Sequence, residues 1–139
     1  MTDEPIVYIV DDDPSIRKSL SGLIRSAGLN VQVFGDVGSF LAQGRSEGPC
    51  CLLLDVRMPR LNGLDLQESL QTAGCHLPII FMTGFGNIPM SVRALKAGAE
   101  DFLEKHVDEK VLLPKILRAL EMDRKELSDR ILMAEKPTK

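Results

Sequence analysis

The chain has 139 residues, which is typical of one domain, and a net charge of −3, which argues against a general nucleic-acid-binding surface. It contains no run of about 18 apolar residues, so we expect no membrane span. The acidic start at residues 1–4 is unlike a secretory signal, and the expected location is therefore the cytoplasm.

Strands and helices are predicted to alternate along the chain. Short apolar runs rich in β-branched and aliphatic residues are typical of strands buried on both faces, and apolar residues at spacings of three and four are typical of helices. This alternation predicts an α/β fold with a parallel sheet. Predicted strands cover residues 6–10, 31–34, 50–55, 79–82 and 101–105. Predicted helices follow the capping residues Asp13, Asp36 and Asp108, lie near residues 64–70, and begin at Pro89.

The last predicted helix contains a proline in an unusual place. Pro114 lies beyond the first turn if the helix begins after Asp108, where it costs about 3 kcal/mol, so the helix is either kinked or starts late. Downstream, a heptad-like seam favours either a dimerising or signal-carrying helix, or a core-facing helix followed by a frayed, charged tail. The seam is interrupted by Arg124 and consists of Leu113, Leu117, Leu120, Leu127, Ile131 and Ala134.

Cysteine spacing gives no sign of a metal or redox site. Cys50 and Cys51 are adjacent and Cys75 stands alone, which fits neither a zinc motif nor a redox pair. We predict two small hydrophobic residues in a buried strand and one loop thiol. His76, beside Cys75, is predicted to be a solvated loop residue.

Chemically active side chains stand at the ends of the predicted strands. Asp11 and Asp12 follow the first strand, Asp55 ends the third, Thr83 follows the fourth and Lys105 ends the fifth. Because the carboxyl ends of parallel strands share one edge, we expect these side chains to meet there. Converging carboxylates repel one another and are usually compensated by a hard divalent cation. Together these groups indicate phosphoryl transfer, with a carboxylate as nucleophile and Lys105 neutralising charge.

The ordered set of motifs resembles the receiver domain of bacterial response regulators. The motifs are VDDDP at residues 10–14, LDVRMP at 54–59, MTG at 82–84 and Lys105, and further details at residues 84–99 resemble the FixJ-type subgroup. The resemblance implies a doubly wound, flavodoxin-like (βα)5 fold with strand order 2-1-3-4-5. It further implies a receiver domain at residues 1–121 and a helical extension or linker at residues 122–139.

The resemblance also implies roles for individual residues. Asp55 is the expected phosphoacceptor for a phosphohistidine on a partner kinase. Mg²⁺ is expected to be held by Asp11, Asp12, Asp55 and the backbone carbonyl of Arg57. Thr83, Lys105 and Phe102 are the expected phosphoryl-binding and switch residues. A homodimer through helix four, strand five and helix five is implied, and no direct contact of this domain with nucleic acid.

The sequence departs from the family pattern at two positions, and two other functions are alternatives to that of a receiver in a transcription regulator. His106 replaces the usual proline after Lys105, and Pro114 interrupts the last helix, so weaker or altered coupling at the output surface is expected. The chain is interpreted as part of a two-domain transcription regulator; the alternative is a stand-alone receiver that acts by protein contact. A Mg²⁺-dependent aspartyl phosphohydrolase is disfavoured, because such enzymes commonly carry a carboxylate where this chain has Arg57.

Overall fold

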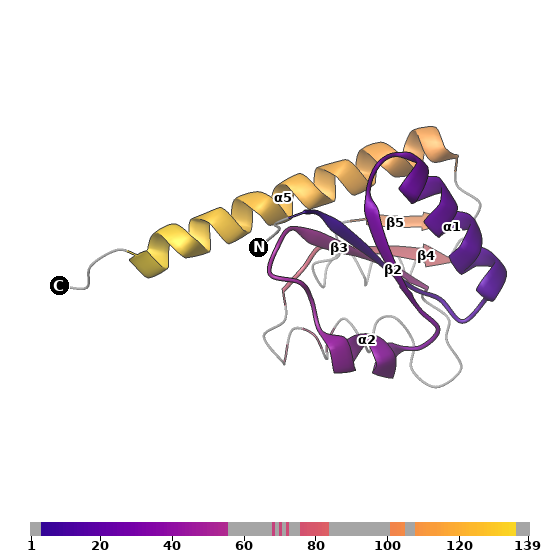
Figure 1. Cartoon of the computed structure of the whole chain (residues 1–139), viewed down its shortest axis with the longest axis horizontal. Coiled ribbons are helices and arrows are strands. Elements are labelled where there is room, and N and C mark those ends of the chain that lie inside the picture. Colours follow the sequence, from indigo (N-terminus) through magenta and orange to yellow (C-terminus); the bar gives the residue numbers. More distant parts are fainter. Residues whose placement is uncertain are drawn as a thin grey trace.

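A computed structural model of the chain describes residues 4–55, 68, 70, 72, 76–83, 101–104 and 108–135. The described residues form strands and helices in the alternating order that the sequence predicts (Figure 1). The elements are β1 (Ile6–Val10), α1 (Pro14–Ser26), β2 (Asn30–Phe34), α2 (Val37–Gln43), β3 (Cys50–Asp55), β4 (Ile79–Thr83), β5 (Asp101–Glu104) and α5 (Glu109–Glu135).

The strands form one parallel sheet in the order β2-β1-β3-β4-β5, which confirms the predicted fold class. Val10 at the end of β1 is paired with Phe34 of β2 on one side and with Leu54 of β3 on the other. Asp55, the next residue of β3, is paired with Met82 of β4. The carboxyl ends of the strands therefore lie side by side along one edge of the sheet.

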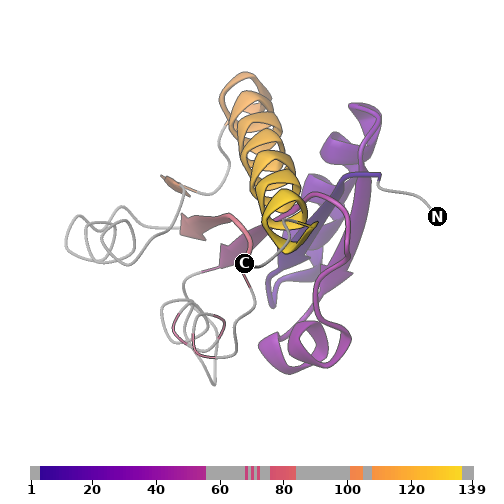
Figure 2. The same cartoon turned by 90° about the vertical axis from the view of Figure 1, so that its left-hand side faces the viewer.

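Helices cover both faces of the sheet, as an all-parallel sheet requires. On one face, Ile24 of α1 and Leu112 and Ile116 of α5 pack in a single core cluster with β-strand residues. On the other face Phe40 of α2 packs in a second cluster, where its ring lies 5.2 Å from that of Tyr8. Figure 2 shows α5 and α2 on opposite sides of the sheet.

The residues that cap α1 and α2 are those that the sequence predicts. Asp13 caps α1 by accepting a hydrogen bond from the Ser15 N–H at 2.8 Å, and Asp36 caps α2 in the same way through Ser39. α1 ends just before Gly28, whose φ of +85° lies in the left-handed region that favours glycine.

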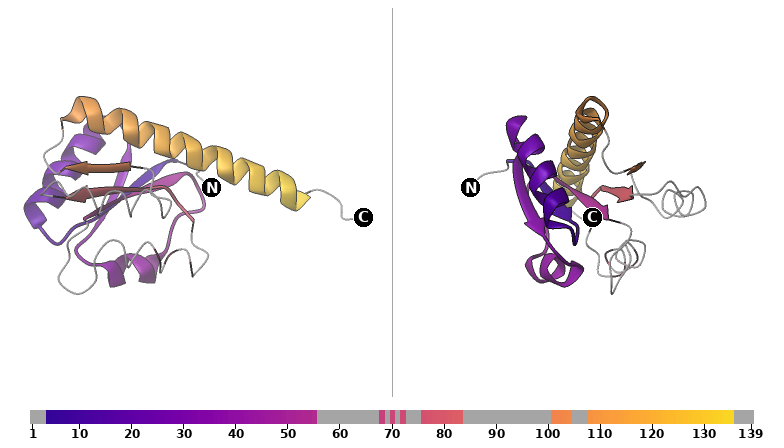
Figure 3. Two further views of the ribbon diagram at one scale, coloured as in Figure 1. Left: turned by 180° about the vertical axis from the view of Figure 1, so that it is seen from behind. Right: turned by 90° about the vertical axis from the view of Figure 1, so that its right-hand side faces the viewer.

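The helix α5 begins at Glu109 and runs through Pro114 to Glu135, so the alternative of a late start at Pro114 is wrong. Asp108 caps it by accepting from the Lys110 N–H at 2.9 Å. The carboxyl-terminal part of the helix extends past the sheet in Figure 1 and in the left view of Figure 3. Among residues 109–129 of α5, whose burial the structure describes, the buried positions are Leu112, Ile116, Ala119, Leu120 and Asp123.

The residues of the predicted seam in α5 do not share one environment. Leu120 belongs to the core, whereas Leu117 is 54 % exposed. The helix is therefore core-facing up to Asp123, and it remains helical to Glu135 rather than ending at the core.

The cysteines and His76 can be compared with their predicted surroundings where the structure describes them. Cys50 and Cys51 are fully buried in β3 and His76 is exposed, as predicted. Cys75 and the predicted helix that begins at Pro89 lie outside the described residues, as do most of residues 64–70. Within the described part of the chain, no helix is long and apolar enough to cross a membrane.

Candidate functional site

Three carboxylates meet at the carboxyl edge of the sheet. One oxygen each from Asp11, Asp12 and Asp55 can be chosen so that all lie within 4.8 Å of one another. Asp11 is 3 % exposed and Asp55 is 4 % exposed, whereas Asp12 is open to solvent. The sequence predicts these residues at one edge of the sheet, and the structure brings them together there.

Strand register explains this convergence. Val10 and Leu54 are paired across β1 and β3, so the next residues, Asp11 and Asp55, stand at the same level of the sheet. Asp11 is held there because its N–H donates to the Phe34 carbonyl at 3.1 Å, which continues the contact between β1 and β2 past the last paired residues.

The loop between β1 and α1 is fixed by two further hydrogen bonds around Asp11. The Asp13 N–H donates to Asp11 Oδ1 at 2.9 Å, and Arg17 Nη1 donates to the Asp11 carbonyl oxygen at 2.6 Å. Arg17 could not be predicted from the sequence, because its partner is a backbone carbonyl, which every residue carries. Its position one turn into α1 aims the side chain back at the strand end from which the helix starts.

The cluster has the chemistry of a site for a hard cation. Negative charges this close repel one another, and two of the three carboxylates are buried from water, so an ion with oxygen ligands would relieve the repulsion. Oxygen ligands of Mg²⁺ lie at about 2.1 Å, so opposite ligands are about 4.2 Å apart. The span of 4.8 Å for the cluster is close to that size, and the residues therefore fit Mg²⁺ with small adjustments.

Other predicted site residues lie partly or wholly outside the description. Thr83 ends β4 and is paired with Glu104, and Phe102 of β5 is paired with Phe81, but the surroundings of the Thr83 and Phe102 side chains are not described. Arg57, Lys105 and His106 are outside the described residues. Thr83 at the end of β4 and Glu104 at the end of β5 are paired, and Asp55 at the end of β3 is paired with Met82. The ends of β4 and β5 therefore lie at the same edge of the sheet as the acidic cluster.

Residues 7–117 match the family of the response regulator receiver domain. The chain is 49 % identical over 120 residues to Nodulation protein W of Bradyrhizobium diazoefficiens, covering 86 % of this chain and 53 % of that protein. It is 41 % identical over 122 residues to Transcriptional regulatory protein FixJ of the same organism, covering 86 % of this chain and 58 % of FixJ. The resemblance to the FixJ-type subgroup is thereby confirmed.

A solved structure with the same fold is that of the response regulator StyR. It superimposes with a TM-score of 0.89 at 42 % sequence identity, covering 95 % of this chain and 67 % of StyR. The chain spans about half the length of the curated relatives it matches.

Proposed function

The chain belongs to the response regulator receiver domain family, and from this membership we propose that Asp55 accepts a phosphoryl group with the help of Mg²⁺ held by Asp11 and Asp12. The observation that carries the proposal is the convergence of the three carboxylates, two of them buried, within 4.8 Å at the sheet edge. The backbone carbonyl of Arg57 is proposed as a further ligand. The ion supplies charge neutralisation between the carboxylates and the incoming phosphoryl oxygens.

The reaction is a transfer between two nucleophiles. A carboxylate oxygen of Asp55 attacks the phosphorus of a phosphohistidine, the new O–P bond forms as the P–N bond breaks, and the departing imidazole takes up a proton. Asp11 is held at the end of β1 by its hydrogen bonds to Phe34 and Asp13, and Asp12 follows it directly, so both carboxylates would stand beside the phosphoacceptor. Catalysis in such transfers is mostly positioning and electrostatic stabilisation, which a rigid sheet edge supports.

The response is proposed to pass through β4 and β5. Thr83 and Lys105 would bind the phosphoryl oxygens, and Phe102 would turn inward as Thr83 leaves its space. The added phosphate brings nearly two negative charges and three strong acceptors, enough to shift a two-state surface. Since Thr83 is the last residue of β4 and is paired with β5, a pull on Thr83 acts directly on the β4–β5 edge.

Partners of the whole protein follow from the family rather than from this chain alone. We propose a sensor histidine kinase as phosphoryl donor and a second copy of the chain as a dimer partner through helix four, β5 and α5. A transcriptional output is proposed by analogy with the relative named Transcriptional regulatory protein FixJ. Residues 1–121 would form the receiver and 122–139 a helical extension. The cytoplasm is the proposed location, because phosphohistidine is made from ATP.

The direct test uses a small phosphoryl donor. The chain is incubated with Mg²⁺ and acetyl phosphate, and its intact mass is measured. We expect a gain of one phosphoryl group that is absent in Asp55→Asn and retained in Asp129→Asn, a matched change at an exposed aspartate of α5. A gain that persists in Asp55→Asn, or no gain at all, contradicts the proposal.

Turnover separates a phosphoacceptor from the alternative phosphohydrolase. The chain is incubated with Mg²⁺ and a generic phosphate ester, and released phosphate is followed over many equivalents. A receiver releases at most the phosphate from its own slow dephosphorylation. Continuous release that depends on Asp55 would favour the hydrolase.

A further inference from the structure

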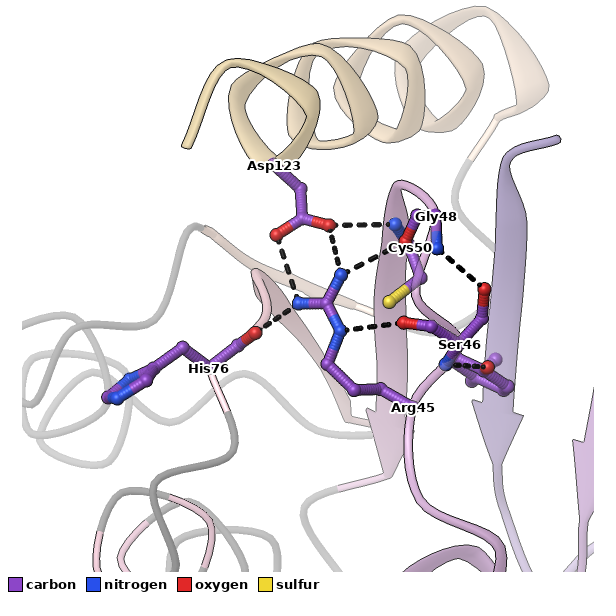
Figure 4. A network of polar contacts seen from close by, with 7 residues as sticks. Arg45, Ser46, Gly48, Cys50, His76 and Asp123 are labelled. Atoms are coloured by element: carbon purple, nitrogen blue, oxygen red, sulfur yellow. Dashed lines mark hydrogen bonds and ion pairs between the residues drawn. The ribbon is translucent and has the colours of Figure 1, made fainter. Parts of the chain in front are cut away.

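A network of polar contacts lies at the end of the sheet opposite to the acidic cluster (Figure 4). Asp123 of α5 is only 3 % exposed, although the neighbouring buried positions on its helix are apolar. Its two carboxylate oxygens accept hydrogen bonds from Arg45, from Nη1 at 3.1 Å and from Nη2 at 2.6 Å. This is a bidentate ion pair between a loop and a helix that are 78 residues apart in sequence.

Arg45 uses its whole hydrogen-bonding capacity in this network. A guanidinium has five N–H donors in a fixed planar fork. Besides the two bonds to Asp123, Nε donates to the Ser46 carbonyl at 3.0 Å and Nη2 to the Gly48 carbonyl at 3.0 Å, and Nη1 donates to the His76 carbonyl. Arg45 thus joins three segments: its own loop, the segment in front of β4, and α5.

Asp123 also completes the sheet at the start of β3. Along a parallel strand, every second N–H points to the same neighbour. The Leu52 N–H donates to the Pro78 carbonyl at 3.0 Å, next to β4, so the Cys50 N–H points to the same side one step earlier. There the acceptor is Asp123 Oδ2 at 2.9 Å. A helix side chain therefore takes the place of a strand carbonyl.

The same network reaches β1 as well. The Ser46 N–H donates to the Tyr8 hydroxyl at 2.7 Å, and the Gly48 N–H donates to Ser46 Oγ at 2.9 Å. Tyr8 is itself buried in the core on the α2 face. The loop that carries Arg45 is accordingly anchored to the middle of the sheet, so that Arg45 holds Asp123 from a fixed base.

We infer that Arg45 and Asp123 form a clamp that fixes the direction in which α5 leaves the receiver. The clamp lies at Asp123, after which the described side chains of α5 are exposed or half-buried. The helical residues that follow, 124–135, are called the arm, and Figure 1 shows the carboxyl-terminal part of α5 extending past the sheet. An apolar residue at 123 would continue the buried stripe but would permit sliding and rotation. A buried ion pair with satisfied hydrogen bonds selects one geometry, which is its best-attested use.

The clamp gives the arm a mechanical connection to β4. Arg45 holds the carbonyl of His76, which lies three residues before β4 begins, and Thr83 ends the same strand. In its last step the inference rests on the proposed function: when β4 responds to phosphorylation, the arm moves with the sheet as one body. The fixed direction of the arm stands independently of that step.

The test measures the direction of the arm in the whole chain. Spin labels are attached at Lys18→Cys on α1 and Lys125→Cys on the arm, both exposed positions. Cys75→Ser is added so that the buried Cys50 and Cys51 are the only native thiols left in the sequence. Distances between the labels are recorded by double electron–electron resonance. We expect one narrow distribution, unchanged by Asp129→Asn. The distribution should broaden several-fold in Asp123→Asn and in Arg45→Lys, which keeps the charge but loses the fork.

Two results would overturn the clamp: a broad distribution in the parent chain, or parent-like widths in either clamp variant. Circular dichroism and thermal unfolding show that each variant is folded, and phosphoryl uptake from acetyl phosphate at Asp55 is measured separately in the same proteins. If the parent takes up no phosphoryl group, the proposed function fails while the distance measurement still decides on the clamp. If Asp123→Asn does not fold, the decision rests on the width of the distance distribution in the parent chain and in Arg45→Lys, which is the milder change.

Discussion

Arg17 and Gly35 share one small space beside the acidic cluster. Arg17 Nη1 donates to the Asp11 carbonyl at 2.6 Å, and a Cβ added to Gly35 would stand 3.2 Å from the same nitrogen. The φ of Gly35 is not in the left-handed region, so the close approach of the arginine is the reason that a side chain is disfavoured there. The loop after β2 thus depends on the residue that braces the loop after β1.

This contact predicts a change of sign in a double-mutant cycle. Gly35→Ala should lower the free energy of unfolding by about 0.5–1 kcal/mol, because the alanine pushes Arg17 away from Asp11. In an Arg17→Ala background the same change should raise it by about 0.5 kcal/mol, because alanine restricts the unfolded chain and no longer meets the guanidinium. Urea unfolding of the four proteins measures the cycle. Equal effects in the two backgrounds would exclude the shared space.

Gly22 and Gly28 both have space for a side chain but differ in backbone conformation, so substitutions there test the effect of conformation alone. A Cβ added at Gly22, inside α1, or at Gly28, just after it, would meet nothing within 4 Å. Of these two glycines, only Gly28 has a positive φ, +85°. Gly22→Ala should therefore stabilise the chain by about 1 kcal/mol through helix propensity, and Gly28→Ala should destabilise it by about 1 kcal/mol through left-handed strain. Thermal unfolding of both variants gives the comparison; a stabilising Gly28→Ala would contradict it.

Because Arg45 and Asp123 are paired, removing one partner should lower the free energy of unfolding more than replacing both by apolar residues. Asp123→Leu alone leaves a nearly buried guanidinium without its carboxylate and should cost about 3 kcal/mol. Arg45→Met together with Asp123→Leu should recover more than half of that loss, because an apolar pair of similar volume needs no counter-charge. Denaturant unfolding checks this cycle. Additive losses in the double variant would show that the ion pair itself, rather than its broken halves, supplies the stability.

The sequence predicted the acidic cluster because its logic is local and topological. Carboxylates at the ends of buried strands must meet wherever those strands are parallel and adjacent, so Asp11 and Asp55 could be placed from pattern alone. The same logic gave the caps Asp13 and Asp36. It gave the element order as well, with β2 starting one residue earlier, at Asn30, than predicted.

The clamp could not be predicted in this way. Asp123 is one of many charged residues in α5, and nothing in the sequence says that Arg45 is its partner. One signal was available: Asp123 lies four residues after Ala119 and three after Leu120, on the buried stripe of the helix. The predicted seam includes Leu113 and Leu117, which do not belong to the buried stripe, and it does not include Asp123. The heptad-like pattern therefore does not indicate that Asp123 is buried.

Burial of Cys51 predicts a loss of stability at alkaline pH. Burial, with smaller contributions from Cys50 and Asp123, raises the pKa of this thiol far above its ordinary value. The folded chain therefore keeps the proton, while the unfolded chain loses it near pH 8.5. The stabilising contribution is fully present well below pH 8.5 and is lost as the pH rises through this value, by about 1.4 kcal/mol near pH 9.5.

Denaturant unfolding at neutral and alkaline pH measures this effect, with Cys51→Ala as the control. The alkaline decline should be smaller in the variant, because it lacks the thiol that titrates on unfolding. In the native chain both Cys50 and Cys51 should resist alkylation and should react only in denaturant. Rapid alkylation of the native strand would refute the assignment of a protonated, buried thiol.

The acidic cluster predicts opposite stability effects with and without Mg²⁺. Without the ion, Asp11→Asn should raise the free energy of unfolding by about 1 kcal/mol, because it removes one of the carboxylates crowded within 4.8 Å. An ion that binds only the folded chain stabilises it by mass action, by about 2.7 kcal/mol at a hundred times its dissociation constant. The parent should therefore gain stability on addition of Mg²⁺, and Asp11→Asn should gain much less.

Thermal unfolding in chelator and in millimolar Mg²⁺, at constant ionic strength, compares the two proteins. Asp129→Asn is the matched control: it removes the same charge from an exposed helix position and should keep the full response to Mg²⁺. Constant ionic strength matters because screening alone would relieve part of the repulsion at the exposed Asp12. If Asp11→Asn destabilises the chain in chelator and leaves the Mg²⁺ response intact, the carboxylates are held by the protein's own hydrogen bonds and the cluster is not a cation site.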